Sequence, residues 1–307
     1  KAFDIYRSRF AEFLAISLKA TTWLGIPFLV LLAGGVIIAS MALAASQGSN
    51  PESVVFTIAG LGVLLVVIYF ALLIFCGAKS FTNEALIARL SFGDLSLKPE
   101  TVKTGWEQIR RRMWHIWLAR FMVGVIIWAA SVGISLVSGF LVGLLTLIWR
   151  EPLLARLLGD ILELLGYVIQ LWLSARFLIP DLSVAMEQIP GDEAITRAWN
   201  LSQGKDFLIM AIVFVAGLMA FPAFIVSVLP FFIFLVTNPA LWAIAPDTFS
   251  NPEVLSQNLP IWQNAIAPGL FWLTISLLLA SCLTLLYIPF WQALRAVIYH
   301  DLTANRT

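Results

Sequence analysis

The hydrophobic positions of the chain gather into six apolar runs, each long enough to cross a membrane as a helix. We place these spans at about residues 21–46, 54–77, 117–140, 161–185, 206–237 and 268–298. A spanning helix needs about 20 mainly apolar residues, because the hydrocarbon core of a bilayer is about 30 Å thick. The pattern therefore predicts an all-α integral membrane protein with six transmembrane helices.

Amphipathic stretches stand before the first, third and fifth spans. In the clearest, Thr101–Arg120, the apolar positions recur at helical spacing. These positions are Val102, Trp106, Ile109, Met113 and Ile116. The pattern predicts a surface helix at 101–115, and weaker versions predict two more at 3–19 and 194–204. We expect these three amphipathic helices to lie on the headgroups or across the mouth of the bundle.

Prolines predict where the helices bend or stop. Pro27 is expected to bend the first span, and Pro180 to kink or separate the last turns of the fourth. The fifth span, which contains Pro222 and Pro230, is expected to be broken or tilted. Residues 141–159 are ambiguous, and we expect a break at 150–152 followed by a short interfacial helix.

Polar stretches predict the connections between spans. Residues 47–53 read as a short turn, and 78–100 as a polar segment whose end, GDLSLKPE, resembles a loop. Residues 238–267, with five prolines at or near them, read as a long outer connection. Of the 19 Lys and Arg residues, all but Arg150 and Arg156 fall on one side of the predicted topology. Because positive loops stay cytoplasmic, both termini are expected there.

Composition supports the membrane class and excludes others. The chain of 307 residues is 60% hydrophobic and 12% charged, whereas soluble domains carry about 25% charged residues. Nucleic-acid binding has no support, because the basic residues are few and stand beside membrane segments. Cys76 and Cys282 lie in apolar runs, no metal-ligand spacing occurs, and no cofactor is expected.

The chain also shows self-similarity that predicts a threefold internal repeat of surface helix plus helical hairpin. Phe10, Trp106 and Trp199 hold one place in the three surface helices, and a large apolar residue follows each by eight positions. Each hairpin then ends at an alanine close to a basic residue, at Ala78, Ala175 and Ala293. We expect one membrane domain over 1–307, with units at about 3–80, 101–180 and 194–298.

Three segments carry a family resemblance. The opening, FDIYRSRFAEFLAISLKATTWLGIP, resembles uncharacterised polytopic membrane proteins of cyanobacteria. AITRAWNLSQGKDFLIM and PFWQALRAVIYHDL are similar to motifs of the membrane-domain family that accompanies some glycerophosphoryl diester phosphodiesterases. The resemblance implies a multi-pass protein of a bacterial inner (plasma) or thylakoid membrane. It carries over no catalytic residues, because the phosphodiesterase of that family is a separate soluble domain.

Two groups of residues are candidates for function. Arg110, Arg111 and Arg112 stand beside Trp114 and Trp117, and arginines clustered next to a span attract anionic headgroups. The alternative is that the cluster only sets the topology.

Near the inner end of the fourth span, Arg176 either snorkels to the headgroups or pairs with Asp181 or Glu187 to line an inner vestibule. Catalytic motifs such as Ser-His-Asp, HExxH or a Walker A loop are absent from the sequence.

These observations favour a non-enzymatic membrane protein, a lipid-interacting scaffold or an accessory subunit of a larger assembly. Its expected partners are membrane lipids with anionic headgroups, and other proteins or further copies of the chain. A transporter or channel for a small or amphiphilic solute is the alternative, because broken helices often build binding sites. A membrane enzyme acting on lipids is a weaker one, because we find no acid–base pair at membrane depth.

Overall fold

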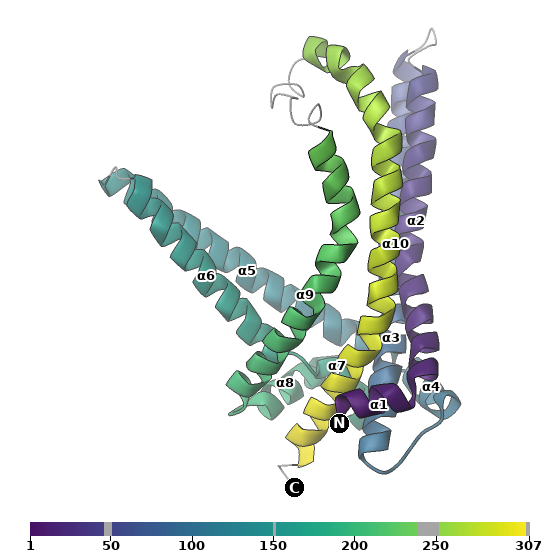
Figure 1. Cartoon of the computed structure of the whole chain (residues 1–307), viewed down its shortest axis with the longest axis vertical. Helices are drawn as coiled ribbons and strands as arrows, with labels where there is room; N and C mark the ends of the chain where they lie inside the picture. The colour runs from purple at the N-terminus through teal and green to yellow at the C-terminus, as the bar shows by residue number, and fades with distance from the viewer. Residues whose placement is uncertain (46–50, 150–151, 239–251, 305–307) are drawn as a thin grey trace. The chain divides into compact units, whose positions relative to one another are not determined.

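The computed structural model describes residues 1–45, 51–149, 152–238 and 252–304, and every regular element in these ranges is a helix (Figure 1). The helices are α1 (Ala2–Ser8), α2 (Phe10–Ala45), α3 (Pro51–Leu95), α4 (Val102–Arg110), α5 (Met113–Trp149), α6 (Pro152–Arg176), α7 (Pro180–Glu187), α8 (Gly191–Ser202), α9 (Asp206–Thr237) and α10 (Pro252–Ala304).

Six segments of the described chain are long and apolar enough to cross a membrane, as the sequence predicted. They are Phe10–Ile38, Phe56–Leu95, Met113–Leu147, Leu157–Glu187, Asp206–Thr237 and Pro268–Ala304. By helix length and composition the chain is therefore a polytopic membrane protein.

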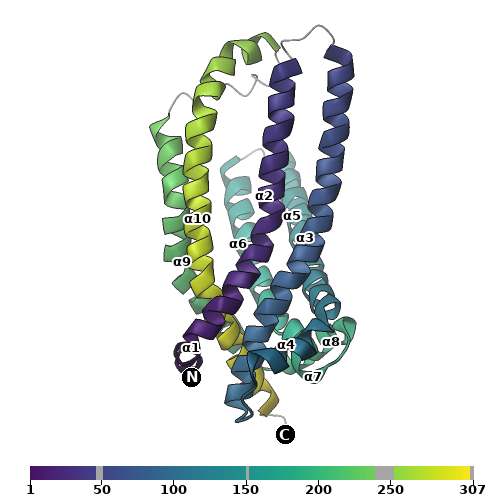
Figure 2. The same cartoon turned by 90° about the vertical axis from the view of Figure 1, so that its right-hand side faces the viewer.

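The chain divides into two compact units. The first comprises Lys1–Phe214 and Ile288–Thr307, and the second Val215–Tyr287. In the first unit, α2 and α3 run side by side as a hairpin (Figure 2). A second hairpin joins α5 and α6, where the Gln170 amide donates to Ser131 Oγ at 2.7 Å. In the second unit, the Phe231 backbone N–H donates to Ser276 Oγ at 3.1 Å and so links α9 to α10.

The short helices α1, α4, α7 and α8 gather at one end of the first unit, around the last turns of α3 and α10 (Figures 1 and 2). We call this assembly the helical base. Both buried hydrophobic clusters of the first unit are built largely from its helices. Their large, fully buried members include Phe13, Leu86, Ile87, Ile116, Leu182 and Tyr299. The well-packed core of the first unit thus lies at the base.

The length of α3 explains how this core forms. At 1.5 Å per residue, its 45 residues span about 68 Å, roughly twice the hydrocarbon thickness. The side chains from Phe56 to Phe75 are exposed or half-buried, whereas most of those from Cys76 onward are buried by protein. The second half of α3 therefore extends past the apolar run into the base.

This extension corrects the prediction that 78–100 is a polar connecting segment, because α3 continues to Leu95. Two of its buried hydroxyl side chains donate hydrogen bonds to carbonyls of the preceding helical turn. Thr82 Oγ1 donates to the Ala78 carbonyl at 2.6 Å, and Ser91 Oγ donates to the Ile87 carbonyl at 2.9 Å. Bonded in this way, they can lie in a core at little cost. The loop is only residues 96–101, with Leu97 in the left-handed region at φ 56°.

Helices stand in the three stretches predicted as surface helices, but with different bounds. The stretch 3–19 is wrong as one helix: the chain turns at Arg9 (φ −118°, ψ 27°), and α2 begins at Phe10. Arg9 is held there by Asp94, its Nε lying 3.0 Å from Oδ2. The stretch 101–115 is likewise wrong as one helix: α4 begins at a capping box of Thr101 and Thr104 and ends at Arg110, and α5 begins at Met113. The third, α8, is close to its predicted range.

The prolines have mixed effects. Pro180 separates α7 from α6, as predicted, and stands in the first turn of α7. Pro27 lies within α2, which runs through it without interruption. Of the two outcomes expected for the fifth span, broken or tilted, the break is absent, since α9 passes through Pro222 and Pro230 as one helix.

Two of the predicted connections are also corrected. Part of the predicted outer connection is helical, because α10 begins at Pro252. No separate interfacial helix stands in the described part of 141–159: α5 extends to Trp149 and α6 begins at Pro152. Residues 46–50, 150–151 and 239–251, which carry the remaining predicted turns, lie outside the described residues.

Candidate functional site

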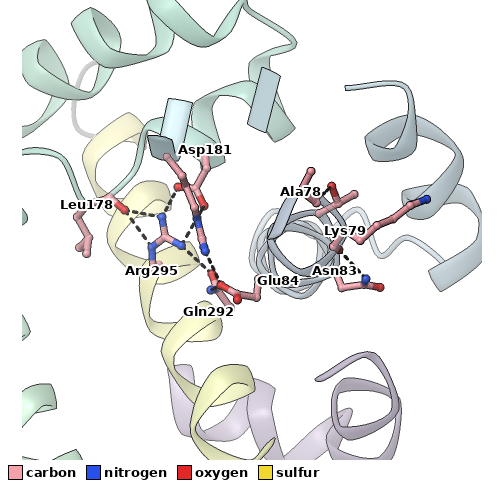
Figure 3. A network of polar contacts seen from close by, with 10 residues as sticks. Ala78, Lys79, Asn83, Glu84, Leu178, Asp181, Gln292 and Arg295 are labelled. Carbon is pink, nitrogen blue, oxygen red and sulfur yellow. Dashed lines mark hydrogen bonds and ion pairs between the residues drawn. The ribbon is translucent and has the colours of Figure 1, made fainter. Parts of the chain in front are cut away.

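The helical base contains a buried network of charged side chains (Figure 3). Asp181, at the start of α7, lies between Arg295 of α10 and Arg120 of α5. Glu84 of α3 and Gln292 of α10 complete the network. Asp181 and the Arg295 side chain are 1% and 5% exposed, whereas Arg120 and Glu84 are 20% and 14% exposed. The network thus ties together four helices that are distant in the sequence.

The two arginines of the network donate hydrogen bonds directly to its two carboxylates. Arg295 donates to both carboxylate oxygens of Asp181, at 3.1 Å for Nη1–Oδ2, and its Nε donates to the Leu178 carbonyl at 2.9 Å. Arg120 Nε donates to Asp181 Oδ2 at 2.9 Å and its Nη1 to Glu84 Oε2 at 2.6 Å.

Gln292 connects Arg295 to Glu84. It accepts from Arg295 Nη1 at 2.9 Å and donates to Glu84 Oε2 at 2.9 Å. Two guanidinium groups therefore face two carboxylates, and the formal charges cancel. A balanced, hydrogen-bonded arrangement is how charged groups are tolerated away from water.

A further ion pair in the base joins Arg89 of α3 to Glu100. Arg89 holds the Glu100 carboxylate with two parallel bonds, of 2.8 and 2.7 Å, and donates to the Ala185 carbonyl at 2.6 Å. This connects α3 to the approach to α4 and to α7. Such bidentate contacts fix orientation as well as charge.

The residues predicted to form a vestibule do not meet one another. Arg176 pairs with Asp206 at 2.9 Å rather than with Asp181 or Glu187. Its guanidinium also lies over the rings of Trp172 and Trp199, at 5.4 and 4.5 Å from their centroids. The expected pairing of Arg176 is thus replaced by a contact at the start of α9.

The other two acids of that group have partners of their own. Asp181 belongs to the buried network, whereas Glu187 accepts from Tyr299 Oη at 2.7 Å and from Arg197 at 2.9 and 3.0 Å. Hydrogen bonding to the Glu187 carboxylate raises the pKa of Arg197. A cleft of about 340 Å³ does lie beside the network, lined by Arg120, Asp181 and apolar residues that include Trp291.

The arginine triplet lies where α4 gives way to α5. Arg110 and Arg111 are exposed and Arg112 is partly buried. Arg112 Nη2 lies 3.5 Å from Gln188 Oε1, and within the described residues none of the three pairs with a carboxylate. Arg111 and Arg112 line a surface cavity of about 610 Å³. Its other lining residues are Glu107, Gln108, His115, Gln188 and Pro190.

The two tryptophans predicted as headgroup contacts lie in the first turns of α5. Trp114 is 51% exposed and packs edge-to-face on Trp117, with ring centroids 6.2 Å apart. Trp117 in turn stacks on Phe121 at 4.9 Å. These rings continue from the arginines toward the apolar part of the span, which is the order expected at a membrane interface.

Sequence reasoning missed the buried network, although one signal points toward it. Glu84 and Asp181 each stand six residues after the alanine that ends a predicted hairpin, Ala78 and Ala175. Aligning the predicted repeat units thus brings the two carboxylates to one position. Both accept from Arg120 in the structure. Arg295 is the basic residue beside Ala293 in the same predicted repeat, but its pairing with Asp181 is not signalled there, and Gln292 has no such signal.

Comparison of the chain with protein-family models, with curated proteins and with solved structures finds no match. The resemblance to the phosphodiesterase-associated membrane domain therefore stays a prediction. The function must be inferred from the geometry of the chain itself.

Proposed function

We propose that the protein is a non-enzymatic membrane protein that binds and organises anionic phospholipids at its helical base. The arginine triplet at 110–112 is the main contact in this proposal, and Trp114 and Trp117 anchor the adjoining helix. Since most basic residues fall on one side of the predicted topology, we place the base and both termini on the cytoplasmic side.

The observation that carries the proposal is a difference between arginines. Six arginines of the first unit each pair with a carboxylate: Arg9, Arg89, Arg120, Arg176, Arg197 and Arg295. Within the described residues neither the triplet nor Arg7 forms such a pair, but the triplet brings three such guanidinium groups together beside a span, so its charge is left for a partner outside the protein. Anionic headgroups are suited to this role, because each basic residue near the surface contributes about 1 kcal/mol of attraction.

The position of the triplet supports the same ligand. It follows the amphipathic α4, whose Ile109 is 1% exposed and packs into the core, and it precedes the span in α5. Basic side chains at such a junction lie at headgroup depth when the span is inserted.

The test is native mass spectrometry of the purified protein titrated with dioleoyl phosphatidylglycerol or dioleoyl phosphatidylcholine. The R110Q/R111Q/R112Q variant should bind phosphatidylglycerol more weakly, by about fivefold for each arginine that contacts a headgroup. Binding of phosphatidylcholine, which carries no net charge, should change little. Raising the salt concentration should weaken phosphatidylglycerol binding to the wild type, since salt screens exposed charges.

The matched control is R7Q/K98Q/K205Q, which also removes three positive charges. Arg7 and Lys98 are exposed, and none of the three forms an ion pair within the described residues. This variant should retain most of the phosphatidylglycerol binding. Equal affinity of the wild type and the triplet variant for phosphatidylglycerol would refute the role of the triplet.

A second candidate, an accessory subunit, is favoured by the sparse packing of the spans. In the most apolar stretch of each span, at most 22% of residues are buried within the described chain. Lipid or another protein must cover these faces. Crosslinking in native membranes followed by mass determination tests this role: a defined larger species supports it, and only the monomer mass contradicts it. The transporter reading has less support, because α9 is unbroken.

A further inference from the structure

A cavity lies between α2, α3 and α4. We infer that it holds the phosphate of one anionic phospholipid, with the acyl chains directed along the α2–α3 hairpin. The inference rests on the proposed function for its ligand class. It concerns different residues from the arginine triplet, so the two can fail separately.

Three lysines and two tryptophans define this cavity, which measures about 480 Å³. Lys19 and Trp23 come from α2, Lys79 from α3, and Lys103 and Trp106 from α4. Three flexible ammonium groups can converge on one anion, each with three donors. Amphipathic indole rings favour the depth of the headgroups.

The charge of the cavity is unbalanced. Its lining includes no carboxylate, and within the described residues none of Lys19, Lys79 and Lys103 forms an ion pair. Lys79 Nζ lies 5.7 Å from the centroid of the Phe75 ring, a weak attraction that leaves its charge uncompensated. An anion in the cavity would remove the mutual repulsion of three cations.

The surrounding backbone favours an anion as well. The first turn of α4, at Val102 and Lys103, lines the cavity. Backbone N–H groups of a first helical turn have no intrahelical partner and attract negative charge. On the α3 side, Asn83 is 4% exposed and donates to the Lys79 carbonyl at 2.8 Å, as Figure 3 shows. This bond fixes the Asn83 side chain at the edge of the cavity.

The apolar side of the cavity indicates a lipid rather than free phosphate. Trp23 packs edge-to-face on Phe75 at 6.1 Å, and Phe28 packs on Tyr69 at 6.3 Å further along the same two helices. Phe28 and Phe75 are 48% and 42% exposed. An acyl chain that leaves the lysines can therefore cover this aromatic seam. Free phosphate would gain nothing from it.

The experiment titrates the full-length protein with dioleoyl phosphatidylglycerol, dioleoyl phosphatidylcholine and inorganic phosphate, and counts bound molecules by native mass spectrometry. The K19Q/K79Q/K103Q variant should lose one tightly bound phosphatidylglycerol, its affinity falling by about fivefold for each lysine that contacts the headgroup and by about a hundredfold if all three do. R110Q/R111Q/R112Q should keep that molecule. The charge-conserving K19R/K79R/K103R should also keep it, because guanidinium groups retain the positive charge and bind phosphate.

Several outcomes distinguish the alternatives. Unchanged binding in the lysine variant overturns this site, whatever the arginine variant does. If inorganic phosphate competes with phosphatidylglycerol at equal concentration, the cavity binds free phosphate and the lipid assignment is wrong. If the lysine triple variant does not elute as one species, Lys103→Gln alone replaces it, because Lys103 is exposed on a surface helix. That single change should weaken binding about fivefold, and no change would refute the site.

Discussion

Replacing Asp181 with Asn would test whether the buried network holds the helical base together. Asp181 is 1% exposed and accepts hydrogen bonds from both Arg295 and Arg120. Asn has nearly the same shape but no charge. After the substitution, Arg120 still pairs with Glu84, but Arg295 loses its carboxylate partner, and the Asn amide places a donor where an acceptor is needed.

The expected loss of stability is large. Removing one member of a buried ion pair costs about 3–5 kcal/mol, mainly because the remaining charge stays buried without compensation. For a large domain, each kcal/mol lowers the melting temperature by about 2–4 °C. The Asp181→Asn variant should therefore melt on the order of 10 °C below the wild type.

The measurement is thermal unfolding in detergent. Size-exclusion chromatography monitors it through the loss of the monodisperse peak as the temperature rises. Arg197→Gln is the matched control: its pair with Glu187 lies in the same base, but Arg197 is 42% exposed, and an exposed pair is worth about 0.2–1 kcal/mol. The double variant D181N/R295Q should lose less than the sum of its single changes, because the two residues interact directly. Equal, small shifts for Asp181→Asn and Arg197→Gln would refute this account of the base.

Two further substitutions test how the helices meet. Gly191→Ala should destabilise by about 1–3 kcal/mol, because a Cβ there would lie 2.7 Å from the His115 carbonyl oxygen. Thermal unfolding measures this, and Gly133→Ala, which meets nothing within 4 Å, should show no such loss. Arg89→Gln removes the two bonds to Glu100 and should increase hydrogen–deuterium exchange in α4. Unchanged exchange there would show that the pair does not hold α4 in place.

The sequence predicted the membrane class and the six spans because these depend on composition and local periodicity. It failed where tertiary contacts override local pattern. Thr82, Asn83 and Glu84 made the region after the second span read as a polar connection. In the structure the first two bond to their own helix and the third joins an ion pair, so the helix continues.

The candidate sites likewise differ in whether a local sequence feature or a tertiary contact defines them. Arg110–Arg112 could be selected from sequence because three adjacent arginines beside a span form a local feature. The pairing of Asp181 with Arg295 could not, since 114 residues separate them and nothing local marks Arg295 as buried. Lys19, Lys79 and Lys103 likewise belong to separate predicted elements, and only the packing of α2, α3 and α4 makes them neighbours. The threefold repeat stays a prediction.

The most direct test of the central claim is to measure the phospholipid that remains on the wild-type protein after extensive washing in mild detergent. The account predicts that anionic phospholipid remains, at one molecule per chain or more, and that zwitterionic phospholipid does not. It also predicts that high salt releases part of the anionic fraction, because exposed charges are screened. Retention of no phospholipid, or of anionic and zwitterionic species in the proportion of the source membrane, would contradict the claim.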